Sequence, residues 1–169
     1  DMSKLVTTVE NPCVAEPTVV FGGRPCDARG FVVLDRPYLG GKFKDPYYAA
    51  RREATAIVTP ACPTAMNGCF CNWVGSDPAD KEGSDVIFTA VEGGFVFEAV
   101  TEKGEALTAQ VADLLEDTDS TAVDAQKEAI AKIVEKLPYA NLSLEGWNGD
   151  ALKEKFDSPL WETLYKPCL

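Results

Sequence analysis

The sequence contains no histidine, and this absence excludes several kinds of site at once. Without an imidazole group there is no Ser-His-Asp or Cys-His nucleophile, no mixed Cys/His zinc site and no haem held by histidine. Any metal bound by this chain must therefore be held by sulfur or oxygen atoms.

Long apolar runs are also missing. No stretch of about 18 apolar residues occurs, so the sequence offers no candidate for a membrane span. Basic residues are scarce, with 16 Lys and Arg against 27 Asp and Glu and a net charge of −11. This balance argues against nucleic acid or an anionic membrane surface as a partner. Residues 1–10 are mixed and polar rather than a secretory leader, and we expect a cytoplasmic protein.

What the sequence does contain is a cluster of cysteines. Three of the six, Cys62, Cys69 and Cys71, fall within ten residues of a loop that also holds proline, glycine and asparagine. This loop follows the strand-like run 54–59, and Cys26 follows another such run at 18–21. Loops at the carboxyl ends of parallel strands are where a ligand site is expected. We therefore expect the four thiolates to form one site, for an iron–sulfur cluster.

The spacing of Cys69 and Cys71 favours a cluster over a single metal ion. In an extended segment the two side chains would point the same way, with Cα atoms roughly 6.5 Å apart, which suits two corners of a [4Fe–4S] cube. A single zinc ion holds its sulfurs roughly 3.8 Å apart, usually by way of a C-x-x-C pair. Buried free cysteines, disulfides in an exported protein and a redox thiol pair remain open as alternatives. Arg24 and Arg29 flank Cys26 and either offset negative charge there or form a solvated pair.

The hydrophobic periodicity predicts an α/β fold with a mixed sheet, flanking helices and a C-terminal helical segment. We expect strands at residues 18–21, 54–59, 85–91 and 95–101. We expect helices at residues 27–34, 45–53, 105–115, 121–137 and 150–156, and one or two helical turns at 159–165. The order strand, helix, helix, strand favours a parallel crossover that brings Cys26 and Cys62 to the same sheet edge. We expect an α/β domain at residues 1–116, which carries the cysteine loop, and a helical extension at residues 117–169.

Six runs in this order resemble one known family. They are GRPCDAR at 23–29, LD at 34–35, DPYYAARREAT at 45–55, CFC at 69–71, GSDV at 83–86 and TEKG at 101–104. The chain resembles the four-iron ferredoxin-type electron-transfer component found as the beta subunit of nickel–iron sulfhydrogenases, which has a relative among the components of anaerobic sulfite reductase. The resemblance extends from about residue 18 to residue 169, and departs from the family pattern at residues 60–63 and 72–75.

The resemblance implies a piece of a longer protein. In the family, the counterpart of residues 160–169 leads into a pair of C-x-x-C-x-x-C ferredoxin motifs. Cys168 would then be the first ligand of a cluster whose other ligands are absent from this chain. The resemblance also implies that Cys26, Cys62, Cys69 and Cys71 ligate a further [4Fe–4S] cluster.

The expected function is electron transfer without catalysis of its own, within a multisubunit anaerobic reductase or hydrogenase. The expected partners are an adjacent ferredoxin module and flavin, hydrogenase or reductase subunits. The alternative is a non-redox docking or structural domain whose cysteines are buried or bind zinc.

Overall fold

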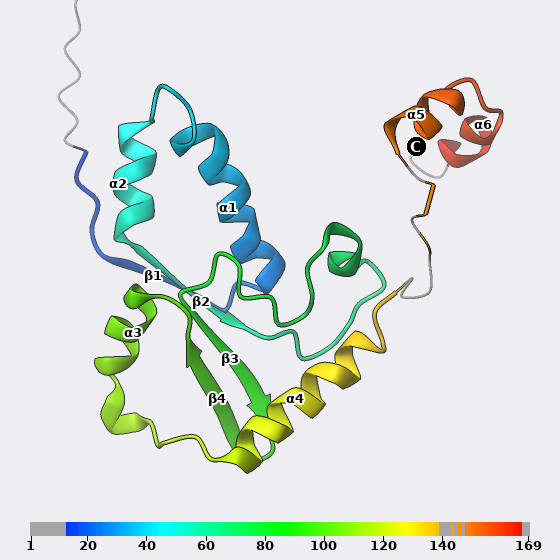
Figure 1. Cartoon of the computed structure of the whole chain (residues 1–169). Helices are drawn as coiled ribbons and strands as arrows, with labels where there is room; N and C mark the ends of the chain where they lie inside the picture. The colour runs from blue at the N-terminus through cyan, green and yellow to red at the C-terminus, as the bar shows by residue number, and fades with distance from the viewer. Residues whose placement is uncertain (1–12, 139–142, 144, 147, 167–169) are drawn as a thin grey trace, which may run out of the picture.

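The computed structural model describes residues 13–138, 143, 145–146 and 148–166 (Figure 1). Cys168 lies outside the described residues. The centre of the fold is a four-stranded sheet in the order β1-β2-β3-β4. Its strands are β1 (Thr18–Phe21), β2 (Thr55–Pro60), β3 (Val86–Val91) and β4 (Gly94–Ala99).

The sheet is mixed, as the sequence predicts. Strands β1, β2 and β3 are parallel, and β4 returns antiparallel to β3 through a hairpin whose Gly93 has a φ of 86°. Helices α1 (Pro25–Leu39) and α2 (Pro46–Ala54) form the crossover from β1 to β2. The expected α/β class, the parallel crossover and the hairpin are therefore confirmed.

The two faces of the sheet are covered unequally. Helix α4 (Ser120–Val134) lies on the face of Thr89, whose hydroxyl accepts a hydrogen bond of 3.1 Å from the Gln126 amide. The opposite face meets α3 (Glu102–Ala109) and the short 3₁₀ turn η3 (Ala112–Leu114), which leave an apolar cavity of about 380 Å³. Beside that cavity lies an aromatic patch. Phe88 stacks on Phe21 and Phe97 at ring distances of 5.4 and 5.2 Å and meets Phe95 edge-on at 5.8 Å.

Asp85 joins three elements at the start of β3. This residue is only 7% exposed, and its carboxylate accepts hydrogen bonds from the Ile57 amide of β2 at 2.8 Å and the Thr101 hydroxyl at 2.6 Å. Its carbonyl oxygen accepts the Val100 amide at 2.8 Å, while Gly104 of α3 packs directly against that carbonyl group. A buried carboxylate that accepts several hydrogen bonds is well satisfied, so Asp85 fixes the position of α3 on the sheet.

The helices begin and end where local capping groups allow. The Asp45 carboxylate accepts the Tyr48 amide at 2.7 Å and caps α2 as predicted. Helix α1 begins at Pro25, before the expected start at Asp27, because the Asp27 carboxylate accepts the Arg24 amide at 2.9 Å from the third helical position. The expected helix at residues 105–115 is wrong in its bounds, since α3 begins at Glu102 and ends at Ala109.

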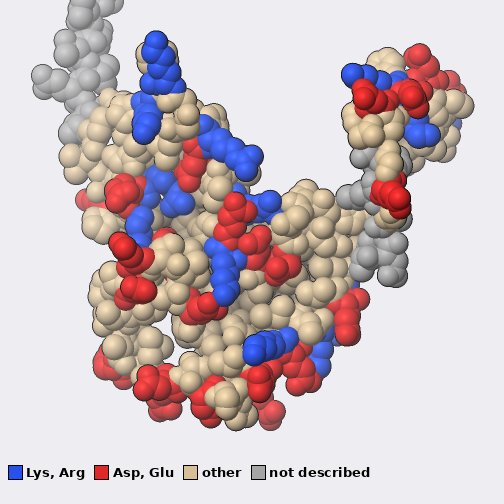
Figure 2. Space-filling view, in the orientation of Figure 1, with Lys and Arg blue, Asp and Glu red and all other residues tan. Residues whose placement is uncertain are grey.

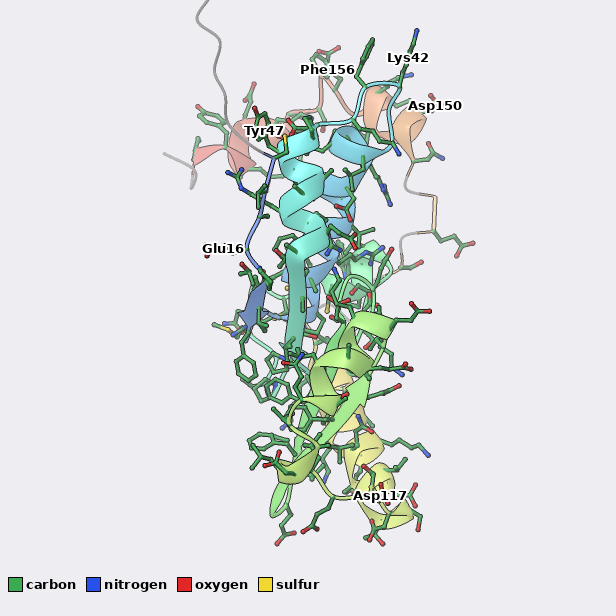
Figure 3. All side chains as sticks on the ribbon, turned by 90° about the vertical axis from the view of Figure 1, so that its left-hand side faces the viewer. Glu16, Lys42, Tyr47, Asp117, Asp150 and Phe156 are labelled. Carbon is green, nitrogen blue, oxygen red and sulfur yellow. The ribbon has the colours of Figure 1, made fainter. Side chains whose placement is uncertain are left out.

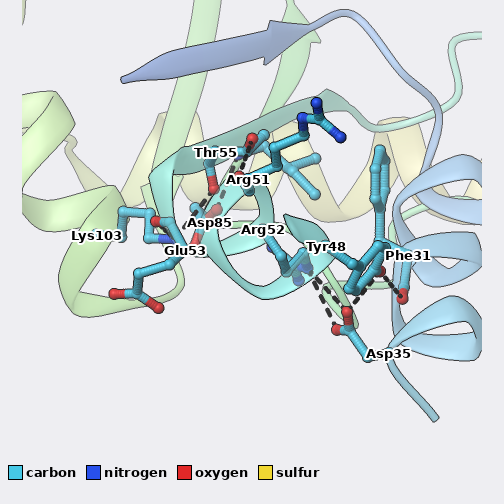
Figure 4. A network of polar contacts seen from close by, with 10 residues as sticks. Phe31, Asp35, Tyr48, Arg51, Arg52, Glu53, Thr55, Asp85 and Lys103 are labelled. Carbon is cyan, nitrogen blue, oxygen red and sulfur yellow. Dashed lines mark hydrogen bonds and ion pairs between the residues drawn. The ribbon is translucent and has the colours of Figure 1, made fainter. Parts of the chain in front are cut away.

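A polar network fixes α1 to α2 and α2 to α3 (Figure 4). The Asp35 carboxylate of α1 accepts the Tyr48 hydroxyl at 2.7 Å and pairs with Arg52 at 3.2 Å. Burial and the neighbouring Asp35 raise the pKa of Tyr48 to about 12, so this hydroxyl remains a donor. The Lys103 ammonium donates to the carbonyl oxygens of Glu53 and Thr55 at the end of α2.

The C-terminal helices α5 (Gly149–Glu154) and α6 (Leu160–Leu164) form a small pair set apart from the sheet (Figure 1). The Trp161 indole donates to the Lys155 carbonyl oxygen at 2.6 Å and joins the two. Helix α4, which belongs to the expected helical extension, packs against β3. The expected boundary between residues 116 and 117 stays a prediction. Among the described helices, none is long and apolar enough to cross a membrane.

Candidate metal centre

Four cysteines from two separate parts of the chain line one cavity. Cys26 lies in the first turn of α1, just after β1, while Cys62 lies two residues beyond the end of β2. Cys69 lies further along the same loop, and Cys71 begins the 3₁₀ turn η2 (Cys71–Val74). The cavity has a volume of about 330 Å³. The structure thus brings together all four residues that the sequence singles out, whereas Cys13 is exposed and does not line the cavity.

Main-chain hydrogen bonds fix both ends of the cysteine loop. The Cys62 amide donates to the Pro78 carbonyl oxygen at 2.8 Å, and the preceding Ala61 amide donates to Phe88 of β3 at 2.7 Å. Gly75 has a left-handed φ of 70°, a conformation that favours glycine, and ends η2 there. The loop is therefore anchored to the sheet on one side and closed by a tight turn on the other.

The local geometry of Cys69 and Cys71 corrects one expectation. Phe70, between them, has φ −143° and ψ 19°, so the segment is not extended, and Cys71 already belongs to a helical turn. The Met66 amide donates to the Cys69 sulfur at 3.2 Å, which closes a small turn around that thiol. The two cysteines reach the cavity by way of a turn rather than along a strand.

One cation and one thioether accompany the thiols. The Arg24 guanidinium lies 3.5 Å from the Met66 sulfur, and both residues line the cavity together with Asp77. Met66 and Asp77 were missed by the sequence reasoning, although Met66 stands between Cys62 and Cys69 in the same loop. Arg29 does not line the cavity, since its guanidinium pairs with Glu82 at 3.1 Å.

The thiols lie close enough to affect one another's ionisation. Burial raises the pKa of Cys62 to about 11, Arg24 opposes this rise, and negative charge on Cys26, Cys71 and Cys69 adds to it. Burial also raises the pKa of Cys71, against the effect of the Asn72 amide. At neutral pH Cys62 therefore carries its proton, and a single arginine supplies too little positive charge for four thiolates.

The four thiols are of the ligand type that iron–sulfur clusters take, and zinc is also held by four cysteines in some proteins. A [4Fe–4S] cube has eight core atoms, and the cavity that the four thiols line has a volume of about 330 Å³. Thiolate is the ligand that such clusters take, and a cationic core would offset the mutual repulsion of the four sulfurs. Within the described residues, no three His, Cys, Asp or Glu side chains converge closely enough to hold a metal ion, so the four thiols line the cavity without forming a preformed metal site.

Comparison of the chain with protein-family models, curated proteins and solved structures finds no match. The resemblance to ferredoxin-type electron-transfer proteins therefore depends on the sequence motifs alone.

Proposed function

We propose that Cys26, Cys62, Cys69 and Cys71 hold a [4Fe–4S] cluster and that the protein is a non-catalytic electron-transfer component of an anaerobic reductase or hydrogenase. The observation that carries this proposal is the presence of four thiols, from two strand ends, around one cavity. The cluster would supply one-electron chemistry. Its partners would be an adjacent ferredoxin module and flavin, hydrogenase or reductase subunits.

The chain's own residues would bind the group and adjust its charge. Four thiolates bring negative charge into the cavity, and Arg24 is the basic residue that lines it. The Met66 amide already donates to the Cys69 sulfur, and hydrogen bonds of this kind to ligand sulfurs raise a cluster's reduction potential. Cys62 must release its proton to act as a ligand, so incorporation of iron should weaken as the pH falls.

Anaerobic reconstitution of the full chain with iron and sulfide tests the proposal. We expect four irons per chain and a broad absorption band near roughly 400 nm that dithionite bleaches. Cys69→Ser and Cys26→Ser should each lose much of the band. Cys13→Ser is the matched control and should keep it, because Cys13 is exposed and outside the cavity.

The alternative, a docking or structural domain, is favoured by one observation, the aromatic patch on the poorly covered sheet face. Phe21 and Phe95 are 68% and 62% exposed there. One zinc ion per chain with no visible band would support this alternative. A band that survives in both Cys69→Ser and Cys26→Ser would overturn the cluster assignment.

A further inference from the structure

The outer face of α1 carries a shallow apolar groove of about 520 Å³, here called the α1 groove. It is lined by Cys26, Asp27, Gly30, Phe31, Val33 and Leu34. Val33 and Leu34 are 53% and 47% exposed, so the packing of α1 on the sheet leaves them uncovered. A Cβ atom built on Gly30 would meet nothing within 4 Å, and the missing side chain lets another surface approach the helix backbone.

Cys26 lines both the α1 groove and the cysteine cavity. It is also the exposed member of the four cysteines, since the other three are half-buried. A molecule seated in the α1 groove would therefore touch a residue that also lines the cysteine cavity. No other residue of the groove lines the cavity.

The charge of the chain is divided between two regions. Residues 13–60, which contain α1 and α2, carry seven Lys and Arg against five Asp and Glu, a net charge of +2. Residues 61–169 carry eight against twenty, a net charge of −12. Figure 2 shows the basic side chains gathered over α1 and α2 and acidic side chains over the far end of the molecule. Figure 3 places Lys42 and Tyr47 at the first end and Asp117 at the other.

Most of the acidic groups near α1 are hydrogen-bonded within the chain, whereas several basic groups form no ion pair within the described part of the chain, although the Lys42 ammonium lies 5.7 Å from the centre of the Phe43 ring. Asp27, Asp35 and Asp45 are hydrogen-bonded to the chain itself. Arg36, Lys42 and Lys44 are exposed and form no ion pair with any described residue. Between the two lysines, Phe43 is 84% exposed at the turn after α1. An exposed aromatic ring between two cations suits an acidic surface with an apolar centre.

We propose that the α1 groove and the basic turn that follows α1, residues 42–44, together dock an acidic electron-carrier protein that exchanges one electron at Cys26, in the first turn of the helix. This inference rests on the proposed function for the electron step: the carrier is oxidised as the cluster held by Cys26 is reduced, or the reverse. The binding itself does not depend on the cluster. A protein partner fits better than an extended polyanion, because the −12 charge of residues 61–169 repels a long anionic chain beyond the groove.

The binding test uses the full chain without iron and an oxidised plant-type [2Fe–2S] ferredoxin, an acidic one-electron carrier, as the probe in titration calorimetry. We expect binding that weakens as the salt concentration rises from about 50 to about 500 mM. Lys42→Glu with Lys44→Glu should weaken it about tenfold or more, because two cations of the proposed docking surface become anions. Val33→Ala with Leu34→Ala should weaken it without changing its salt dependence.

The matched control is Lys127→Glu with Lys136→Glu on and after α4, which makes the same change in net charge at residues that belong neither to the α1 groove nor to the basic turn. If the control weakens binding as much as the Lys42 and Lys44 pair, total charge rather than the α1 groove is responsible, and the proposal is overturned. Self-association of the chain that only the Lys42 and Lys44 pair abolishes would assign the groove to a second copy. If the chain co-sediments with phosphatidylserine vesicles and the Lys42→Glu, Lys44→Glu variant does not, that result would assign the α1 groove to a membrane. Either result also overturns the proposal.

A second measurement separates this proposal from the proposed function. Stopped-flow reduction of the reconstituted chain by reduced ferredoxin should slow about tenfold in the Lys42 and Lys44 pair, while reduction by dithionite is unchanged. If the chain takes up no cluster but still binds ferredoxin through α1, the proposed function fails and the docking site stands. If the cluster forms, and ferredoxin reduces the variant with Lys42→Glu and Lys44→Glu at the wild-type rate, only the docking proposal fails.

Discussion

The contact between Gly104 and the main chain of Asp85 allows a stability effect to be predicted in detail. Gly104 is the third residue of α3 and is buried. A Cβ atom there would collide with the Asp85 carbonyl oxygen, and would lie 2.7 Å from its carbonyl carbon and 3.2 Å from the Val86 Cγ2. These backbone atoms cannot turn aside as a side chain could, because Val100 donates to the same carbonyl oxygen at 2.8 Å.

Gly104→Ala should therefore lift α3 away from the sheet. Overpacking of this kind costs about 1–3 kcal/mol. Weakening the bond from the Thr101 hydroxyl to the Asp85 carboxylate adds about 1.5–3 kcal/mol. The higher helix propensity of alanine offsets about 1 kcal/mol of this loss in stability. The expected loss in the free energy of unfolding is about 1.5–5 kcal/mol in total.

The matched control is Gly30→Ala in α1, where an added Cβ meets nothing within 4 Å. This change should stabilise the protein by about 0.5–1 kcal/mol, because alanine restricts the unfolded chain. Urea denaturation of the full chain, followed by circular dichroism, measures both variants. A Gly104→Ala protein within about 0.5 kcal/mol of the wild type would refute the reasoning, since α3 would then not rest on the Asp85 carbonyl group.

Three further predictions concern single side chains. Asp45→Ala should lower the free energy of unfolding by about 1 kcal/mol in the same denaturation assay, because the first turn of α2 loses its cap. Without iron, alkylation of Cys62 by iodoacetamide should rise about tenfold per pH unit until it levels off near pH 11, as peptide mass spectrometry can measure. Folding raises the pKa of Cys62 from 9.0 to about 11. The folded state therefore holds this proton more tightly than the unfolded chain, and the resulting contribution to the free energy of unfolding is present below pH 9 and is lost as the pH rises to 11. Arg24→Gln should raise the pKa of Cys62 further and slow its alkylation at pH 9, and an unchanged rate would contradict the role given to Arg24.

Much of the sheet could be predicted because its signals are local. The run at β2 is apolar and β-branched, and Gly93 and Gly94 mark the hairpin between β3 and β4. The chain order then required a parallel crossover, and the crossover rule placed the residues after β1 and β2 at one edge. The convergence of Cys26 on the loop that begins with Cys62 follows from that rule without any further information.

The bounds of α3 could not be predicted in the same way. Thr101 caps this helix by accepting the Gly104 amide at 3.2 Å, and its own hydroxyl is oriented by Asp85, a residue sixteen positions earlier. In the sequence, Gly104 is typical of a segment before a helix rather than inside one. Its actual role is to allow close approach to the Asp85 backbone, and that contact exists only in the folded protein.

The fine geometry of the cysteine site was also beyond the sequence. Alternation suggested an extended Cys69-Phe70-Cys71 segment, but the left-handed Gly75 and the bond from the Ser76 amide to the Cys71 carbonyl oxygen wind it into η2. The pairing of Arg24 with Met66 joins residues forty-two positions apart and has no signature in spacing. Only the identities of the four thiols, not the way they face the cavity, were visible in the chain.

The aromatic patch beside α3 has a practical consequence for anyone who follows the folding of this protein. Dyes such as ANS fluoresce on exposed apolar surface and are commonly taken to report a molten globule. Phe21 and Phe95 offer such surface in the native state. The folded protein should therefore bind ANS and increase its fluorescence. Loss of near-ultraviolet circular dichroism, rather than dye fluorescence, is then the signal that the tertiary packing is lost.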